Sequence, residues 1–168
     1  MKLHLFLAAT LACIKPSHAS CDATSPTGTS APGPEASPYC PPRPVSPEEQ
    51  KAILADFVQV FYVEKDINKT AAHFDVNYIQ HNPAVLSGRQ AFIDAFTAAS
   101  SSNTTSTTTI VHQALQDNIA YFHYKSETPG SPITAIVDMF RFEESCIMEH
   151  WDVIESLPAD AKNPLALF

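Results

Sequence analysis

Two periodicities divide the chain from Ser46 onward. Apolar side chains first recur at helical spacing, in a stripe made of Ile53, Leu54, Phe57, Val58, Phe61 and Tyr62. This spacing predicts an amphipathic helix that ends near Glu64. Ser46, Pro47 and Glu49 form a capping box with proline at the first helical position, so the helix is expected to begin there.

The helical period gives way to a period of two toward the C-terminus. Residues 67–74 and 88–100 are predicted as helices, separated by an irregular segment at 75–88. Four β-branched or aromatic runs follow, at 109–116, 119–126, 133–143 and 147–155. Short turns between such runs predict antiparallel hairpins. Helices followed by a meander of strands are typical of an α+β fold, with the helices on one face of a curved sheet.

The chain before Ser46 has a different composition. Lys2, an apolar run and the small residues Ser17 and Ala19 follow the order of a secretory signal peptide. Most of the chain's 14 prolines lie at 22–47, a stretch with too few aliphatic residues to bury a core. We therefore expect a secreted, extracellular protein with a signal peptide at 1–19, a disordered Pro/Ser/Thr-rich linker at 20–46 and one domain at 47–168.

The charge restricts the partners. The net charge is −8, and removal of Lys2 and Lys15 with the leader makes the mature chain more acidic. No cluster of lysine or arginine favours nucleic acid or an anionic membrane surface, so neither is expected as a partner. Sequons at Asn68 and Asn103 predict a glycoprotein if the chain enters a eukaryotic secretory pathway.

Three cysteines remain after cleavage of the leader. Cys21 and Cys40 flank the proline-rich stretch and could close a loop, which leaves Cys146 as a free thiol. The two other pairings stay open, because sequence alone does not choose between them.

Asp138 is the first candidate for chemistry. In the third run it shares one face with Ile136, Phe140 and Phe142, whereas Arg141 points to the other face. A carboxyl group shielded from water by large apolar side chains suits proton transfer. The alternative is that this face is open to water or that the charge is neutralised structurally.

Histidines supply the remaining candidates. His150 and Asp152 are neighbours on one face of the last run, where Asp152 could orient His150, or the two could be a structural pair on the outer face. His81 lies in a loop just after Tyr78, and loops set on a rigid scaffold often carry functional groups. Among the histidines and cysteines no metal-ligand spacing is found, nor any nucleotide fingerprint, so neither metal nor cofactor is expected.

Three motifs together resemble a known family. Tyr78-Ile-Gln-His-Asn-Pro83, Val137-Asp-Met-Phe-Arg141 and Ile147-Met-Glu-His-Trp-Asp-Val-Ile154 look like the SnoaL-like polyketide cyclase group of the nuclear transport factor 2-like superfamily. The resemblance spans 48–168. It implies a cone-shaped barrel, in which a bent antiparallel sheet wraps the N-terminal helices around a largely apolar pocket. Such proteins often dimerise through the outer face of the sheet, so a homodimer is expected.

The resemblance also implies roles for particular residues. Asp138 would act as base or acid, with His81 as its polar partner or oxyanion donor and His150 as a third catalytic candidate. The expected pocket residues are Tyr78, Phe140, Trp151 and Asp152. The function it implies is a cofactor-independent lyase, isomerase or cyclase, which moves a proton in an aldol-type reaction of a small carbonyl compound. The alternative is a secreted module that binds a small apolar ligand or a partner without turnover.

Overall fold

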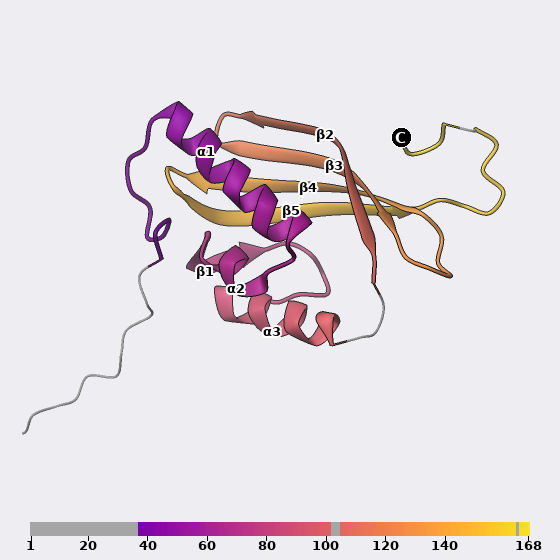
Figure 1. Ribbon diagram of the computed structural model, residues 1–168, viewed down its shortest axis with the longest axis horizontal. Helices are drawn as coiled ribbons and strands as arrows, with labels where there is room; N and C mark the ends of the chain where they lie inside the picture. The colour runs from indigo at the N-terminus through magenta and orange to yellow at the C-terminus, as the bar shows by residue number, and fades with distance from the viewer. Residues whose placement is uncertain (1–36, 102–104, 164) are drawn as a thin grey trace, which may run out of the picture. The chain divides into compact units, whose positions relative to one another are not determined.

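The computed structural model describes residues 37–101, 105–163 and 165–168. Its central element is a five-stranded mixed sheet with strand order β1-β5-β4-β3-β2 (Figure 1). The elements in chain order are α1 (Pro47–Val58), the π-helical turn η1 (Gln59–Val63), α2 (Ile67–Ala71), β1 (Phe74–Gln80), α3 (Arg89–Ser100), β2 (Thr107–Gln116), β3 (Ile119–Glu127), β4 (Thr134–Glu143) and β5 (Cys146–Ser156). The predicted α+β architecture is confirmed.

Helix α1 begins where the capping box predicts. The Ser46 hydroxyl oxygen accepts a hydrogen bond from the backbone N–H of Glu49 at 3.1 Å, and Pro47 occupies the first helical position. The helix then widens into η1, whose π-helical turn keeps both Val60 and Tyr62 buried. Turns of this kind occur often at functional sites, and here the turn places Tyr62 toward the sheet.

The four predicted strands β2 to β5 pair as consecutive antiparallel hairpins. The fifth strand, β1, was not predicted: residues 75–88 were expected to be irregular, yet Phe74–Gln80 pairs in parallel with β5. Its register shifts between Phe74 and Ile79, and its partner lies far along the chain. The sheet is therefore mixed rather than wholly antiparallel.

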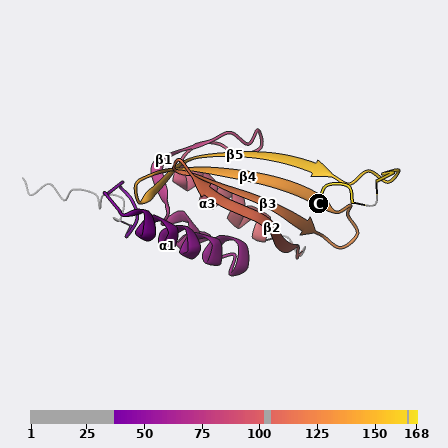
Figure 2. The ribbon, with the colours of Figure 1, turned by 90° about the horizontal axis from the view of Figure 1, so that it is seen from above.

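Aromatic side chains form the core between the helices and the sheet. Figure 2 shows α1 lying along one face of the strands. Phe57 of α1 is fully buried and contacts Phe122 of β3 and Phe140 of β4, with ring centroids 6.5 and 4.8 Å apart. Phe74 and Phe92 extend this packing to β1 and α3 at 4.7 Å. The face of the sheet that meets the helices is called the inner face below.

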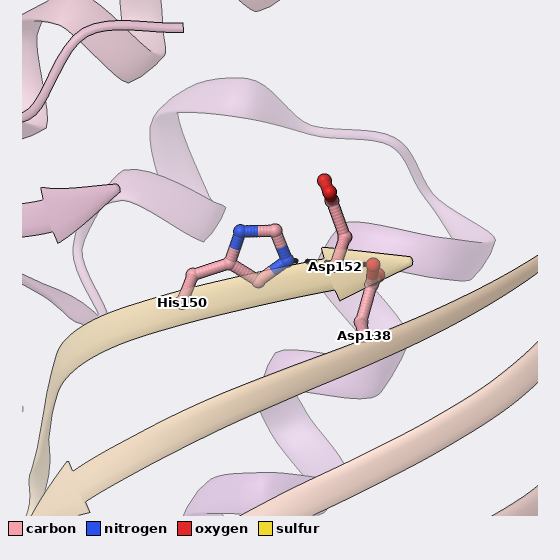
Figure 3. Close-up of side chains that lie close together, drawn as sticks. All are labelled: Asp138, His150 and Asp152. Carbon is pink, nitrogen blue, oxygen red and sulfur yellow. Dashed lines mark ion pairs between the residues drawn. The ribbon is translucent and has the colours of Figure 1, made fainter. Parts of the chain in front are cut away.

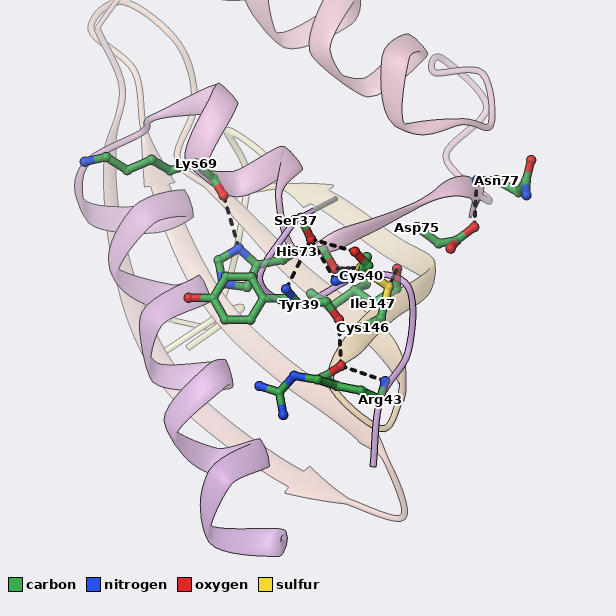
Figure 4. Close-up of a disulfide and its surroundings, with 11 residues drawn as sticks. Ser37, Tyr39, Cys40, Arg43, Lys69, His73, Asp75, Asn77, Cys146 and Ile147 are labelled. Atoms are coloured by element: carbon green, nitrogen blue, oxygen red, sulfur yellow. Dashed lines mark hydrogen bonds between the residues drawn. A yellow bond between two sulfur atoms is a disulfide. The ribbon is translucent and has the colours of Figure 1, made fainter. Parts of the chain in front are cut away.

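The segment before α1 corrects the predicted linker boundary. A disordered linker was expected through residue 46, but 37–46 packs against the domain (Figure 4). Cys40 is 2% exposed and forms a disulfide with Cys146 at the start of β5. Tyr39 stacks on the buried His73 at 4.0 Å, and the Ser145 hydroxyl donates to the Tyr39 carbonyl at 2.6 Å. Cys146 is thus bonded, rather than a free thiol beside a Cys21–Cys40 loop.

Several sequence predictions concern residues outside the described ranges. The leader at 1–19, Cys21 and the sequon at Asn103 all lie there. Asn68, the other sequon, is exposed on α2, and its glycosylation stays a prediction. Within the described residues, no helix combines the length and the apolarity that crossing a bilayer would need.

Candidate functional site

A cluster of three titratable side chains lies on the inner face of β4 and β5 (Figure 3). Asp138 stands directly opposite Asp152 in the antiparallel register, and Phe140 stands opposite His150. Because side chains alternate along a strand, Asp138, His150 and Asp152 lie on the same face of the sheet. The sequence alone had not decided which face of β5 carries His150 and Asp152. Asp138 is 3% exposed and His150 is 7% exposed. We call these three residues the inner cluster.

Two buried tyrosines lie near the Asp138 carboxylate, and one of them donates to it. The Tyr62 hydroxyl donates to Asp138 Oδ2 at 2.6 Å, and the Tyr124 ring packs against Tyr62 with ring centroids 5.2 Å apart. Burial, followed by the Asp138 charge, raises the pKa of Tyr62 well above its usual value, and the same causes raise the pKa of Tyr124. Both phenols therefore keep their protons at neutral pH, and Tyr62 is the donor to Asp138.

Gln80 at the end of β1 fixes the proton position on His150. The Gln80 Oε1 atom accepts from the backbone N–H of Asn82 at 2.9 Å, which identifies it as the amide oxygen. The same oxygen lies 2.7 Å from His150 Nδ1, so Nδ1 must carry the proton. His150 Nε2 then directs its lone pair toward Asp138 Oδ1, 3.3 Å away.

This contact between His150 and Asp138 lacks a proton when both groups are in their ordinary forms. The distance is within range of an ion pair, yet Nε2 makes no hydrogen bond to any described residue. A neutral imidazole nitrogen and a carboxylate oxygen are both acceptors. The contact therefore leaves two acceptor atoms facing each other with no donor between them.

Asp152 adds a second negative charge to the inner cluster. Its Oδ2 atom accepts from Asn82 Nδ2 at 2.5 Å. Each cluster residue offers one ligand atom, and the three atoms lie within 4.8 Å of one another. The inner cluster is therefore also the group of described residues whose chemistry could hold a metal ion.

A cavity of about 440 Å³ lies beside the inner cluster. Its apolar wall comes from η1, α3 and β4, and its polar groups are hydroxyls and one ammonium group. The lining includes Phe61, Tyr62, Lys65, Ile67, Thr70, Phe92, Phe96, Ser106, Thr108, Tyr124, Ser126 and Ile136. Because Tyr62 belongs both to this wall and to the contacts of Asp138, a bound molecule would be separated from the carboxylate by its phenol.

The structure separates the predicted catalytic residues into two groups. It brings Asp138 and His150 together, but it places His81 on the opposite face of β5. His81 stacks on Trp151 at 4.9 Å with nearly parallel rings, and its Nε2 lies 2.8 Å from Glu149 Oε1. His81 thus does not contact Asp138, as was expected, because the loop after β1 carries its side chain over the outer surface.

None of the four predicted pocket residues lines this cavity. Tyr78 is buried against Phe74 at 4.3 Å, and Phe140 is a core ring that stacks on His150 at 4.5 Å. Asp152 belongs to the inner cluster. Trp151 lies on the outer face with His81 and is not a pocket wall. Alternation along β5 explains the position of Trp151, since Glu149, Trp151 and Val153 face away from the helices.

Sequence reasoning missed the residues that connect the cavity to Asp138. Tyr62 looked like one more member of the apolar helix stripe, and Tyr124 like a strand residue. A signal was present, because a phenol buried among phenylalanines needs a hydrogen-bond partner. Gln80 belonged to a quoted motif but was assigned no role. Its contact with His150 depends on the parallel pairing of β1 with β5.

Comparison with known proteins identifies the fold. No protein-family model matches the chain, and no curated protein matches it significantly in sequence. Solved structures do match. A candidate ketosteroid isomerase from Kribbella flavida superposes with a TM-score of 0.57 at 9% identity, over 69% of this chain and 84% of that one. A candidate SnoaL-like polyketide cyclase from Shewanella denitrificans gives 0.53 at 10% identity, over 64% and 90%.

A nuclear transport factor 2-like protein of unknown function from Burkholderia xenovorans gives a TM-score of 0.55 at 15% identity, over 68% of this chain and 88% of that one. The domain therefore has the nuclear transport factor 2-like fold, and the resemblance seen in the motifs is confirmed at the level of the fold. Because this fold supports many activities, the function has to be argued from the site itself.

Proposed function

We propose that this nuclear transport factor 2-like domain is a cofactor-independent proton-transfer enzyme of the isomerase, lyase or cyclase type. Its substrate is a small, largely apolar carbonyl compound held in the cavity beside Tyr62 and Tyr124. One observation carries the proposal: Tyr62 lines the cavity, and its hydroxyl donates to Asp138 at 2.6 Å. A proton can therefore move between the cavity and a buried acid–base pair.

The proposed step is a relay through Tyr62. A substrate carbon next to the carbonyl loses its proton to the Tyr62 oxygen, while the Tyr62 proton passes to the Asp138–His150 pair. The substrate becomes an enolate, and the pair gains one proton, which fits between His150 Nε2 and Asp138 Oδ1. Return of this proton to another atom would complete an isomerisation, and attack of the enolate on a second carbonyl would close a ring.

The enolate oxygen needs hydrogen-bond donors. The hydroxyls of Thr108 and Ser126 and the ammonium group of Lys65 line the same cavity and can serve this purpose. Donors aimed at developing charge are a large part of such catalysis. Phe92 and Phe96 supply the apolar wall that would hold the remainder of the substrate.

The predicted leader supports an extracellular place of action for this enzyme.

A homodimer is the second part of the proposal. Large apolar side chains are left exposed at Val111, Tyr121 and Val153, and a second copy would pack on the outer face of the sheet.

An exchange experiment tests the reaction without knowledge of the natural substrate. The purified, chelator-treated chain would be incubated in D₂O with cyclohexanone, acetophenone and acetylacetone, and loss of the α-protons followed by NMR. Asp138→Asn should lower the catalysed rate by at least about 100-fold. Asp94→Asn, an exposed acid on α3, is the matched control and should leave the rate unchanged. Equal rates for wild type and Asp138→Asn would contradict the proposal.

A binding module without turnover is the second candidate. It is favoured by the position of Asp138, which is 3% exposed and stands behind the tyrosines rather than in the cavity wall. In that case the same ketones would bind without exchange. Their affinity would survive Asp138→Asn and fall on Phe96→Ala, as measured by calorimetry.

A further inference from the structure

The inner cluster contains more negative charge than its surroundings balance. Asp138 and Asp152 are directly opposite each other on neighbouring strands, an arrangement that is unfavourable for like charges. Among the described residues, no lysine or arginine forms an ion pair with either of them. Arg141, the cation on the same strand, pairs with Glu149 on the outer face at 2.8 Å. A positive charge is therefore needed inside the cluster.

His150 points to where that charge belongs. Its ring is more than nine-tenths buried, and Nε2 makes no hydrogen bond within the described part of the chain. Gln80 keeps the proton on Nδ1, so the Nε2 lone pair faces Asp138 Oδ1. A buried imidazole that presents a lone pair to a carboxylate is the arrangement of two ligands of one cation.

We propose that Asp138, His150 and Asp152 form a binding site for a divalent first-row metal ion such as Zn²⁺ or Mn²⁺. One imidazole nitrogen with two carboxylates is a ligand set that suits these ions. Two donors at about 2.0–2.2 Å from such an ion lie about 3.0–3.5 Å apart. His150 Nε2 and Asp138 Oδ1 are 3.3 Å apart, and the ligand atom of Asp152 lies within 4.8 Å of the ligand atoms of the other two residues.

Each of the three ligands already has a hydrogen-bond partner outside the cluster. Tyr62 donates to Asp138 Oδ2, Gln80 accepts from His150 Nδ1, and Asn82 donates to Asp152 Oδ2. Metal-binding histidines and carboxylates generally have such outer partners, which fix the ligand orientation. The orientation of each ligand side chain is thus restrained by a neighbour. Sequence spacing did not reveal the cluster, since the ligands come from two strands without a local motif.

This inference does not rest on the proposed reaction. A cation between His150 Nε2 and Asp138 Oδ1 occupies the place of the shared proton, so the loaded and the proton-transferring forms exclude each other. Metal binding is measured without any ketone, and proton exchange is measured on chelator-treated protein. Failure of one proposal is therefore distinguishable from failure of the other.

The test uses the full chain, stripped with chelator and titrated with Co²⁺ as a visible-absorbing stand-in for Zn²⁺. The expected result is one Co²⁺ per chain with ligand-field bands, displaced by Zn²⁺. His150→Gln and Asp152→Asn should each weaken binding by at least tenfold. Gln80→Leu keeps all three ligands and should weaken it by about tenfold through loss of the Nδ1 acceptor. Thermal unfolding checks that each variant is folded.

A surface histidine pair provides the control. His112 Nδ1 and His123 Nδ1 are 3.2 Å apart on exposed parts of β2 and β3, where they could capture a metal ion adventitiously. His112→Ala should leave the Co²⁺ stoichiometry and affinity unchanged. The proposal is overturned if no saturable binding is seen, or if His112→Ala abolishes binding that folded His150→Gln and Asp152→Asn retain.

Discussion

The two faces of β4 and β5 carry nearly the same side-chain types in opposite surroundings. On the inner face His150 meets Asp138 and Asp152. On the outer face His81 and Arg141 meet Glu149 at 2.8 Å each. The outer network is complete, because a donor stands on either side of the Glu149 carboxylate, and it borders on water. The inner cluster is buried and lacks a positive charge, so a proton or a metal ion bound there would be stabilised by its two carboxylates.

This difference teaches that residue type alone does not mark a site. His81 belongs to a motif of the resembled family and has a carboxylate partner, yet its side chain is 42% exposed and does not line the cavity. Tyr62 belongs to no motif, yet it connects the cavity to Asp138. The face of the strand and the hydrogen-bond balance decide which histidine has chemistry available.

Removal of an aromatic ring should have the largest effect and should differ between the faces. Phe140, 1% exposed, packs against Phe57 and His150, so Phe140→Ala should cost about 3–5 kcal/mol of unfolding free energy. Trp151→Ala on the outer face should cost less than half of that. Urea unfolding measures both, and equal losses would contradict the assignment of the faces.

Loss of the disulfide should affect both faces together, because Cys146 begins β5. Cys40→Ala with Cys146→Ala should lower the unfolding free energy by about 2–5 kcal/mol, since the bond closes a long loop. Cys21→Ala is the control and should change nothing under the same oxidising conditions. If Cys21→Ala alone destabilised the domain, a different pairing would be present in solution.

Single polar substitutions sharpen the comparison further. Tyr62→Phe removes a buried hydrogen bond to a charged group and should cost about 1.5–3 kcal/mol. Arg141→Gln removes a half-exposed ion pair and should cost about 0.2–1 kcal/mol. The two variants would be compared by thermal and urea unfolding at one pH. A larger loss from Arg141→Gln would mean that the outer network, rather than the inner one, is the structurally critical group.

The smallest expected effect is a change in acid sensitivity on the outer face. The hydrogen bond from His81, followed by Arg141, holds the pKa of Glu149 below its usual value of 4.5. A carboxyl group with a lowered folded-state pKa stabilises the fold above its unfolded pKa, and this contribution is lost as the pH falls through the folded pKa. Glu149→Gln should therefore flatten the stability profile below about pH 4.5. An unchanged profile would show that the pair contributes nothing in solution.

Local patterns predicted a large part of the fold. The capping box located the start of α1, and the period of two located β2 to β5 and the inward direction of Asp138. Strand β1 was missed because Phe74–Gln80 carries Asp75 and Asn77 and pairs, with an irregular register, to the last strand. The packed segment 37–46 was missed because a disulfide, rather than apolar content, attaches it to the domain.

The site was less predictable than the fold because its contacts are non-local. Tyr62 and Asp138 are 76 positions apart, and Gln80 and His150 are 70 apart. The periodicity of the sequence does not show which residues of η1 and β4, or of β1 and β5, meet in the folded chain. Side chains in the loop after β1 do not alternate between the two faces of the sheet as they do in a strand. The face on which His81 lies could therefore not be predicted from the sequence.

One NMR spectrum tests the central claim most directly, because it reports the proton positions of both histidines together. A long-range ¹H–¹⁵N spectrum of chelator-treated, ¹⁵N-histidine-labelled protein at neutral pH would be assigned with His150→Gln and His81→Gln. The account predicts a proton on Nδ1 of His150, held by Gln80, and on Nε2 of His81, held by Glu149. A His150 protonated at Nε2 alone would contradict it, because the space facing Asp138 would then already be filled.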